Sequence, residues 1–120
     1  MKIASSENAF TNMPEPQNFE EGALAFTIAD ACKKFRYGKV VSTSLVQETF
    51  KPGWFTKCLC RHITGDWGAL DEEDMEANDN ALEHGGRLLS NYVHPETGER
   101  LWIITEHDRS LTTLMLPMEY

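Results

Sequence analysis

The feature that most constrains the fold is a series of three strand-like segments at the end of the chain. Residues 88–94 and 100–106 are separated by a Pro-Glu-Thr-Gly turn, and residues 111–116 follow a second turn of polar residues. Short runs rich in β-branched and aromatic residues, bounded by turn residues, predict strands. We therefore expect a hairpin that continues into a three-stranded meander.

The middle strand of this meander is apolar at both odd and even positions. Leu101 and Ile103 should point to one face of the sheet, and Trp102 and Ile104 to the opposite face. This pattern is typical of a central strand that is covered on both sides. One face can be covered by the helices predicted below, so the second face needs another cover, and we expect a homodimer.

Three helices are predicted before the meander. Thr43 or Ser44 is a suitable N-cap for a short helix over 44–50. Pro52 fits the first turn of a helix that runs to residue 63. Its apolar residues recur on one broad face, with Lys57 and Arg61 predicted to point outward. That face consists of Trp54, Phe55, Cys58, Leu59, His62 and Ile63.

The clearest helix begins after Asp71. Asp71 is a suitable N-cap, three acidic residues follow it in the first turn, and Gly85-Gly86 supplies the stop. Residues 23–35 also carry apolar residues at helical spacing, but Leu24, Phe26 and Ile28 alternate as well, so a strand stays open there. Residues 35–42 predict a short strand.

The domain organisation follows from these elements. Residues 1–21 contain two prolines and no periodic apolar pattern, which predicts a flexible leader. Residues 22–120 form a single domain, since 120 residues suffice for one core. The fold class is α+β, with helices packed on one face of a small antiparallel sheet that ends in the three-stranded meander.

The charge of the chain is acidic overall and unevenly distributed. The formal net charge is −8, with eight acidic residues and no cation between 66 and 83, and a mostly cationic stretch between 31 and 65. This acidity makes nucleic-acid binding unlikely, because such binding requires neutralisation of phosphates. The sequence contains no run of about 20 apolar residues, which a membrane-spanning helix would need. Three cysteines without disulfide spacing indicate a reducing compartment, so we expect a cytoplasmic protein.

Common signatures of cofactor and metal sites are missing from the sequence. It contains no GxGxxG, no phosphate-binding loop and no HExxH, so no cofactor is predicted. Cys58, Cys60, His62 and Asp66 are metal-ligand residue types. On a helix, however, Cys60 points away from the face that Cys58 and His62 share. We therefore favour a buried Cys58, a core or capping His62, and no metal.

Two polar segments nevertheless carry residues that are suited to catalysis. A histidine beside a carboxylate can transfer protons, and an arginine can hold an anionic group. If these segments meet at one end of the sheet, the chain is a small hydrolase or nuclease. If they do not, the residues make loop hydrogen bonds, and Arg109 pairs with Asp66 or Asp108. The catalytic candidates are His62, Asp66, Glu106, Asp108 and Arg109.

Other residues are candidates for binding a partner. Trp67 lies between turn residues and is either an exposed anchor or a side chain folded onto the core. Trp102 belongs to the second face of the sheet. Glu72, Glu73 and Glu76 lie on the acidic helix, whose carboxylates either are merely solvated or mimic nucleic-acid phosphates and inhibit a DNA-binding protein.

The segment from Phe35 to Tyr120 resembles an uncharacterised family of small proteins encoded on plasmids, phages and other mobile elements. The motifs that carry the resemblance include Gly-Asp-Trp-Gly at 65–68, Gly-Arg-Leu-Leu-Ser at 86–90 and Leu-Trp-Ile-Ile-Thr-Glu at 101–106, followed by Asp-Arg-Ser at 108–110. The family has no established activity, so the resemblance implies a mobile-element setting and no particular reaction. We therefore expect a non-catalytic accessory protein that binds another protein or associates with itself.

Overall fold

The computed structural model describes residues 19–120, which fold around a four-stranded sheet with the order β1-β4-β3-β2. The predicted leader lies outside the described residues over positions 1–18. The first described helix begins at Phe19, so its first turn includes residues 19–21, which were assigned to the leader. The strands are β1 Lys39–Ser42, β2 Leu88–Val93, β3 Arg100–Thr105 and β4 Leu111–Met115.

The three helices before the meander follow their predicted positions closely, whereas the first helix begins and ends four residues earlier than the segment 23–35 that carried the helical spacing. They are α2 Phe19–Ala31, α3 Ser44–Thr49, α4 Pro52–Ile63 and α5 Glu72–His84, and a short 3₁₀ helix, η2, spans Pro117–Glu119. The alternative of a strand near Leu24 is wrong, because this segment is a helix that packs against α4. Thr43 and Asp71 are the N-caps of α3 and α5, each accepting a hydrogen bond from the backbone three residues later.

The sheet is mixed. The predicted meander is present, since β2, β3 and β4 are antiparallel neighbours, and β1 is added beside β4 in parallel. A parallel neighbour is compatible with this chain because three helices and two strands lie between β1 and β4 in sequence. Gly38, with φ +64, allows the chain to enter β1, since a Cβ there would come within 2.3 Å of the Ser110 backbone.

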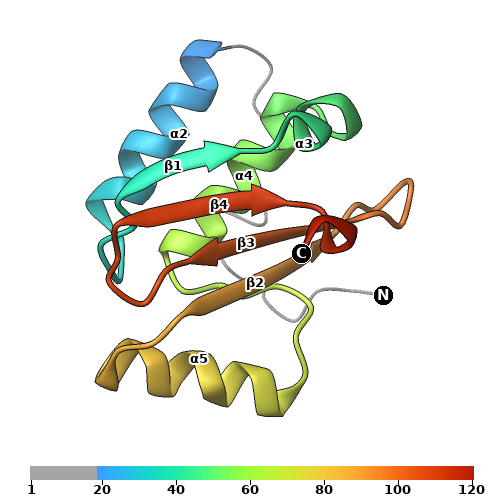
Figure 1. The fold of residues 1–120 in the computed structure, drawn as a ribbon. Coiled ribbons are helices and arrows are strands. Elements are labelled where there is room, and N and C mark those ends of the chain that lie inside the picture. The colour runs from blue at the N-terminus through green and yellow to red at the C-terminus, as the bar shows by residue number, and fades with distance from the viewer. Residues whose placement is uncertain (1–18) are drawn as a thin grey trace.

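The elements form two layers. Helices α2, α3 and α4 lie on one face of the sheet, and α5 runs beside β2 (Figure 1). The main core fills the space between α4 and the sheet, and it contains Val46, Phe50, Cys58, Leu59, Ile63, Tyr92, Leu101, Ile103 and Leu114. The predicted fold class, α+β with helices on one face of a sheet that ends in a meander, is confirmed. The sheet is not wholly antiparallel as predicted, because β1 pairs with β4 in parallel.

The outer edge of β2 is closed by two neighbouring segments. The Asn78 side chain donates to the Leu89 carbonyl (2.7 Å) and accepts from the Leu89 N–H (3.1 Å), so a helix residue substitutes for a strand. Next along the edge, the Asn91 backbone bonds to Trp67 and Ala69 through a short parallel bridge. The backbone groups of β2 that point away from β3 at these positions are thereby paired.

Candidate functional site

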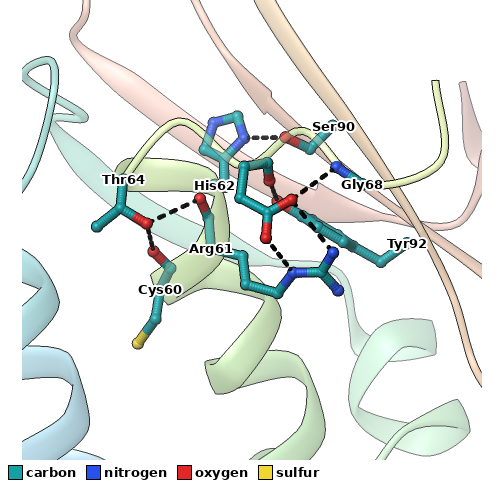
Figure 2. Close-up of polar contacts among 8 residues, drawn as sticks. Cys60, Arg61, His62, Thr64, Gly68, Ser90 and Tyr92 are labelled. Carbon is teal, nitrogen blue, oxygen red and sulfur yellow. Dashed lines mark hydrogen bonds and ion pairs between the residues drawn. The ribbon is translucent and has the colours of Figure 1, made fainter. Parts of the chain in front are cut away.

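The end of α4 places most of the polar residues that the sequence singled out. Gly65, with φ +87, reverses the chain, its N–H donates to the His62 carbonyl, and the Asp66 N–H donates to the Arg61 carbonyl. These two bonds form a Schellman motif, which suits glycine at the left-handed position. The Thr64 hydroxyl also donates to the carbonyls of Cys60 and Arg61 (Figure 2). The motif turns Asp66 back over the last turn of the helix.

Asp66 and Arg61 form a buried ion pair. Arg61 Nε lies 2.8 Å from Asp66 Oδ2, and a terminal guanidinium nitrogen lies 3.2 Å from Oδ1. The guanidinium also covers the Tyr92 ring at 4.7 Å from its centroid, and the Tyr92 hydroxyl donates to the Asp66 carbonyl. The prediction that Arg61 points outward is therefore wrong, because the returning loop supplies a carboxylate that stabilises the buried charge.

His62 occupies the centre of a buried chain of hydrogen bonds. Its Nδ1 lies 2.6 Å from the Ser90 hydroxyl, and its Nε2 lies 2.9 Å from the Thr105 hydroxyl. Thr105 in turn contacts Thr112 at 2.7 Å, and Thr112 donates to the Tyr37 carbonyl. A carbonyl only accepts, so Thr112 uses its proton there, Thr105 donates to Thr112, and Nε2–H of His62 donates to Thr105. In the neutral ring, Nδ1 then accepts from Ser90.

This environment keeps the imidazole neutral. His62 is completely buried, with the rings of Phe35 and Trp67 packed edge-on against it. The pKa of His62 is lowered to about 3, mainly by burial and secondly by the nearby charge of Arg109. Both ring nitrogens are occupied by protein hydroxyls. The prediction of a core histidine describes this position, and a buried ring of such low basicity is poorly suited to general base catalysis near neutral pH.

Arg109 holds backbone carbonyls instead of a carboxylate. Its guanidinium donates to the carbonyls of Ala81 (2.9 Å), Glu106 (3.1 Å) and Gly86. It thereby joins the C-terminal end of α5 to the turn between β3 and β4. A cation is favoured at the C-terminal end of a helix by the helix dipole. The backbone of Arg109 adopts φ 62, a left-handed conformation that is uncommon for a side chain of this size. The expected pairing of Arg109 with Asp66 or Asp108 does not occur.

Asp108 and Glu106 belong to the same turn as Arg109. One oxygen of Asp108 accepts from the backbone N–H and the hydroxyl of Ser110, and these hydrogen bonds lower the pKa of Asp108. Glu106 contributes its backbone, which accepts from the Arg109 N–H. The five catalytic candidates thus separate into His62 and Asp66 at the end of α4 and three residues in the β3–β4 turn.

The partner-binding candidates divide between the interior and the surface. Trp67 is buried and stacks on Phe35, so the interpretation as a side chain folded onto the core describes it, and it is no exposed anchor. Glu72, Glu73 and Glu76 are exposed on α5. Trp102 is half-buried on the sheet face opposite the helices, where the Tyr120 ring packs edge-on against it.

The sheet face opposite the helices, here called the outer face, has an apolar centre. Alternation along the paired strands places on it Leu89, Trp102, Ile104, Leu111 and Met115. Ile104 is buried, whereas the others are half-buried. At its border, the Arg87 guanidinium lies over the Tyr120 ring at 5.1 Å from the centroid, and Arg100 is exposed at the start of β3.

Two further features bear on ligand binding, a hollow at the end of α5 and the buried cysteines. An open hollow of about 480 Å³ lies at the end of α5, lined by Ala77, Asn80, His84, Gly85 and Arg87 among others. Within residues 19–120, no group of three or more His, Cys, Asp and Glu side chains is placed to hold a metal ion. Burial raises the pKa of Cys58 and also raises that of Cys60, to about 11, so both thiols are protonated at neutral pH.

Sequence reasoning overlooked three residues that organise this region. Arg61 was assigned to the exposed face of α4, and Ser90 and Thr105 were treated only as strand residues. The Thr-Gly-Asp sequence after α4 is the signal for Arg61, because a Schellman motif returns the following residue toward the last helical turn. Ser90 and Thr105 offer no comparable signal, because their contacts with His62 depend on how α4 lies across the sheet.

No helix in the described part of the chain is long and apolar enough to cross a membrane. Comparison with models of protein families gives no match, and searches among curated proteins and among solved structures also give none.

Proposed function

We propose that this chain is a non-catalytic accessory protein of a mobile element, and that it binds another protein through the outer face of its sheet. The observation that carries this proposal is the apolar centre of that face. Trp102 and Met115 are neighbours on adjacent strands, and both are half-buried. Aromatic residues and methionine on an accessible surface are enriched where proteins bind one another.

The border of the face indicates the chemistry of the partner. Arg87 and Arg100 carry positive charge beside the apolar centre, although the chain as a whole is acidic. Arginine beside an aromatic centre is a common combination at energetically important positions of interfaces. A partner surface with an apolar centre and acidic residues around it would complement this arrangement.

The contacts of the polar residues favour binding over catalysis. His62 is enclosed, and its nitrogens face two protein hydroxyls. Arg109 is engaged by three carbonyls, and Asp66 is paired with Arg61. Each of these groups thus forms hydrogen bonds or an ion pair with other residues of the fold, which is the ordinary role of buried polar side chains.

Affinity capture from the host, with partners identified by mass spectrometry, tests the proposal. We expect Trp102→Ser and Arg100→Glu each to lose the proteins that the wild-type chain retains, because they remove the apolar centre and reverse one border charge. Lys51→Glu, which makes the same charge change at the start of α4, is the control and should retain them. Retention of the same proteins by folded Trp102→Ser and Arg100→Glu would contradict the proposal.

A further inference from the structure

The free edge of β1 has backbone groups that nothing in the described residues pairs. The N–H groups of Lys39 and Thr43 donate to Ser110 and Leu114 of the β4 side. In a parallel ladder the bonding residues alternate, so the N–H and C=O groups of Val40 and Ser42 point away from β4. An edge strand of this kind is a template for a further strand.

The two ends of β1 carry opposite charges. Lys39 is exposed at the start of the strand. At the other end, the carboxylate of Glu119 accepts a hydrogen bond from the Thr43 hydroxyl at 2.8 Å, so a negative charge is fixed there. Lys39 and Thr43 have the same parity along the strand and therefore lie on the same face. An antiparallel neighbour with the same charge order would meet opposite charges at both ends.

We propose that two copies of this chain associate through β1, antiparallel and about a two-fold axis. The outward residues determine the register: Val40 of each copy pairs with Ser42 of the other, so that Val41 faces its own counterpart. This register forms a mutual pair of N–H···O=C bonds on each side of the axis. It joins the two sheets into one of eight strands and removes both free β1 edges.

The same register brings the charged ends together. Lys39 of one copy lies directly opposite Thr43 of the other, at the distance of a cross-strand pair, and therefore beside Glu119. The two Lys39 side chains lie at opposite ends of the contact. Arg36, which is also exposed, precedes β1 and adds a second cation at the same end as Lys39.

The helix layer offers an additional contact at this edge. In Figure 1, α2 lies on the β1 side of the molecule, above α4. Leu24 and Ile28 lie one helical turn apart on α2 and are 62% and 43% exposed. The two-fold arrangement places the α2 helices of both copies on the same face of the joined sheet. Leu24 and Ile28 are therefore on the side of the sheet where the two helix layers meet.

This assembly does not depend on the proposed binding function. The two-fold axis is perpendicular to the sheet, so both outer faces lie on the same side. Dimerisation through β1 would leave Trp102 accessible and place two outer faces side by side. A partner with two copies of the matching surface would then bind with higher avidity.

Light scattering at micromolar concentration tests the assembly. We expect about twice the 13.6 kDa chain mass for the wild type, and the mass of one chain for Lys39→Glu, which places two carboxylates together at each end. The double variant Lys39→Glu with Glu119→Lys exchanges the charges and should restore the dimer. Lys51→Glu is the matched control and should stay dimeric. Thermal unfolding verifies that each variant is folded.

Two other variants separate this dimer from its alternatives. Val40→Pro removes an outward N–H and should give a folded monomer, whereas Trp102→Glu should stay dimeric if it folds. A wild-type monomer would overturn the proposal. A dimer that persists in both Lys39→Glu and Val40→Pro, or one that Trp102→Glu splits while the chain stays folded, would also overturn it and assign the contact to another surface.

Discussion

The two edges of the sheet differ in how their backbone groups are treated. At β2, the Asn78 amide and the backbone from Trp67 to Ala69 pair with the outward groups of Leu89 and Asn91. At β1, no described residue does so, and the exposed Lys39 begins the strand. The chain thus closes one edge with its own side chains and loops. The difference indicates that the closed β2 edge contributes to stability, and the β1 edge is the one that we propose for association.

The largest effect is expected from removing the Arg61–Asp66 ion pair, which positions residues 67–69 beside the β2 edge. Asp66→Ala leaves the buried guanidinium of Arg61 without this carboxylate, directly before Trp67. Breaking a buried pair by removing one partner costs about 3–5 kcal/mol. We expect a loss of that size in the free energy of unfolding, measured by urea denaturation. A loss below about 1 kcal/mol would mean that Asp66 does not stabilise the closed edge.

A pH titration tests the buried His62, which links α4 to β2 through Ser90. The pKa of His62 is about 3 in the folded chain, against an ordinary value of 6.5. Between pH 6.5 and 3, this histidine is therefore protonated in the unfolded chain and neutral in the folded chain. Stability should therefore fall as pH falls below about 6.5, with a slope that reaches about 1.4 kcal/mol per pH unit once the histidine of the unfolded chain is mostly protonated. The urea midpoint between pH 6.5 and 5 measures this slope, above the range where most carboxylates titrate.

One variant assigns that slope. His62→Gln removes the titrating ring and should flatten the dependence, although it also lowers stability at every pH. An unchanged slope in His62→Gln would mean that another group causes the loss.

The side chain that closes the β2 edge gives a smaller effect. Asn78→Ala removes two hydrogen bonds and leaves the N–H and C=O of Leu89 without these partners. Unsatisfied backbone groups at such a position cost about 1–3 kcal/mol. Hydrogen exchange at Leu89 should also become faster than in the wild type. A variant as stable as the wild type, with unchanged exchange, would show that the edge is closed without Asn78.

The sequence predicted features that depend on local contacts and did not predict those that depend on long-range contacts. Asp71 was recognised as an N-cap, and Thr43 as one of two candidates with Ser44, because a cap depends on residues three positions away. The mixed sheet was not predicted, since the parallel pairing of β1 with β4 joins residues about 70 positions apart. The same limit applies to the site. Arg109 was recognised as a residue with a polar role, but its acceptors, including Ala81 and Gly86, belong to a different element.

The smallest effect is expected at the open edge, and two neighbouring residues define it. Proline lacks an N–H, so its cost in a strand depends on where that N–H points. At Val41 the N–H points to β4, and Val41→Pro should cost about 1–3 kcal/mol, because the facing carbonyl is left unpaired. At Val40 the N–H points away from the sheet, and Val40→Pro should change the stability of the single chain by no more than about 0.5 kcal/mol. Urea unfolding at concentrations low enough for the monomer compares them. Equal losses at both positions would mean that the N–H of Val40 is already paired within one chain, and that the β1 edge is closed as the β2 edge is.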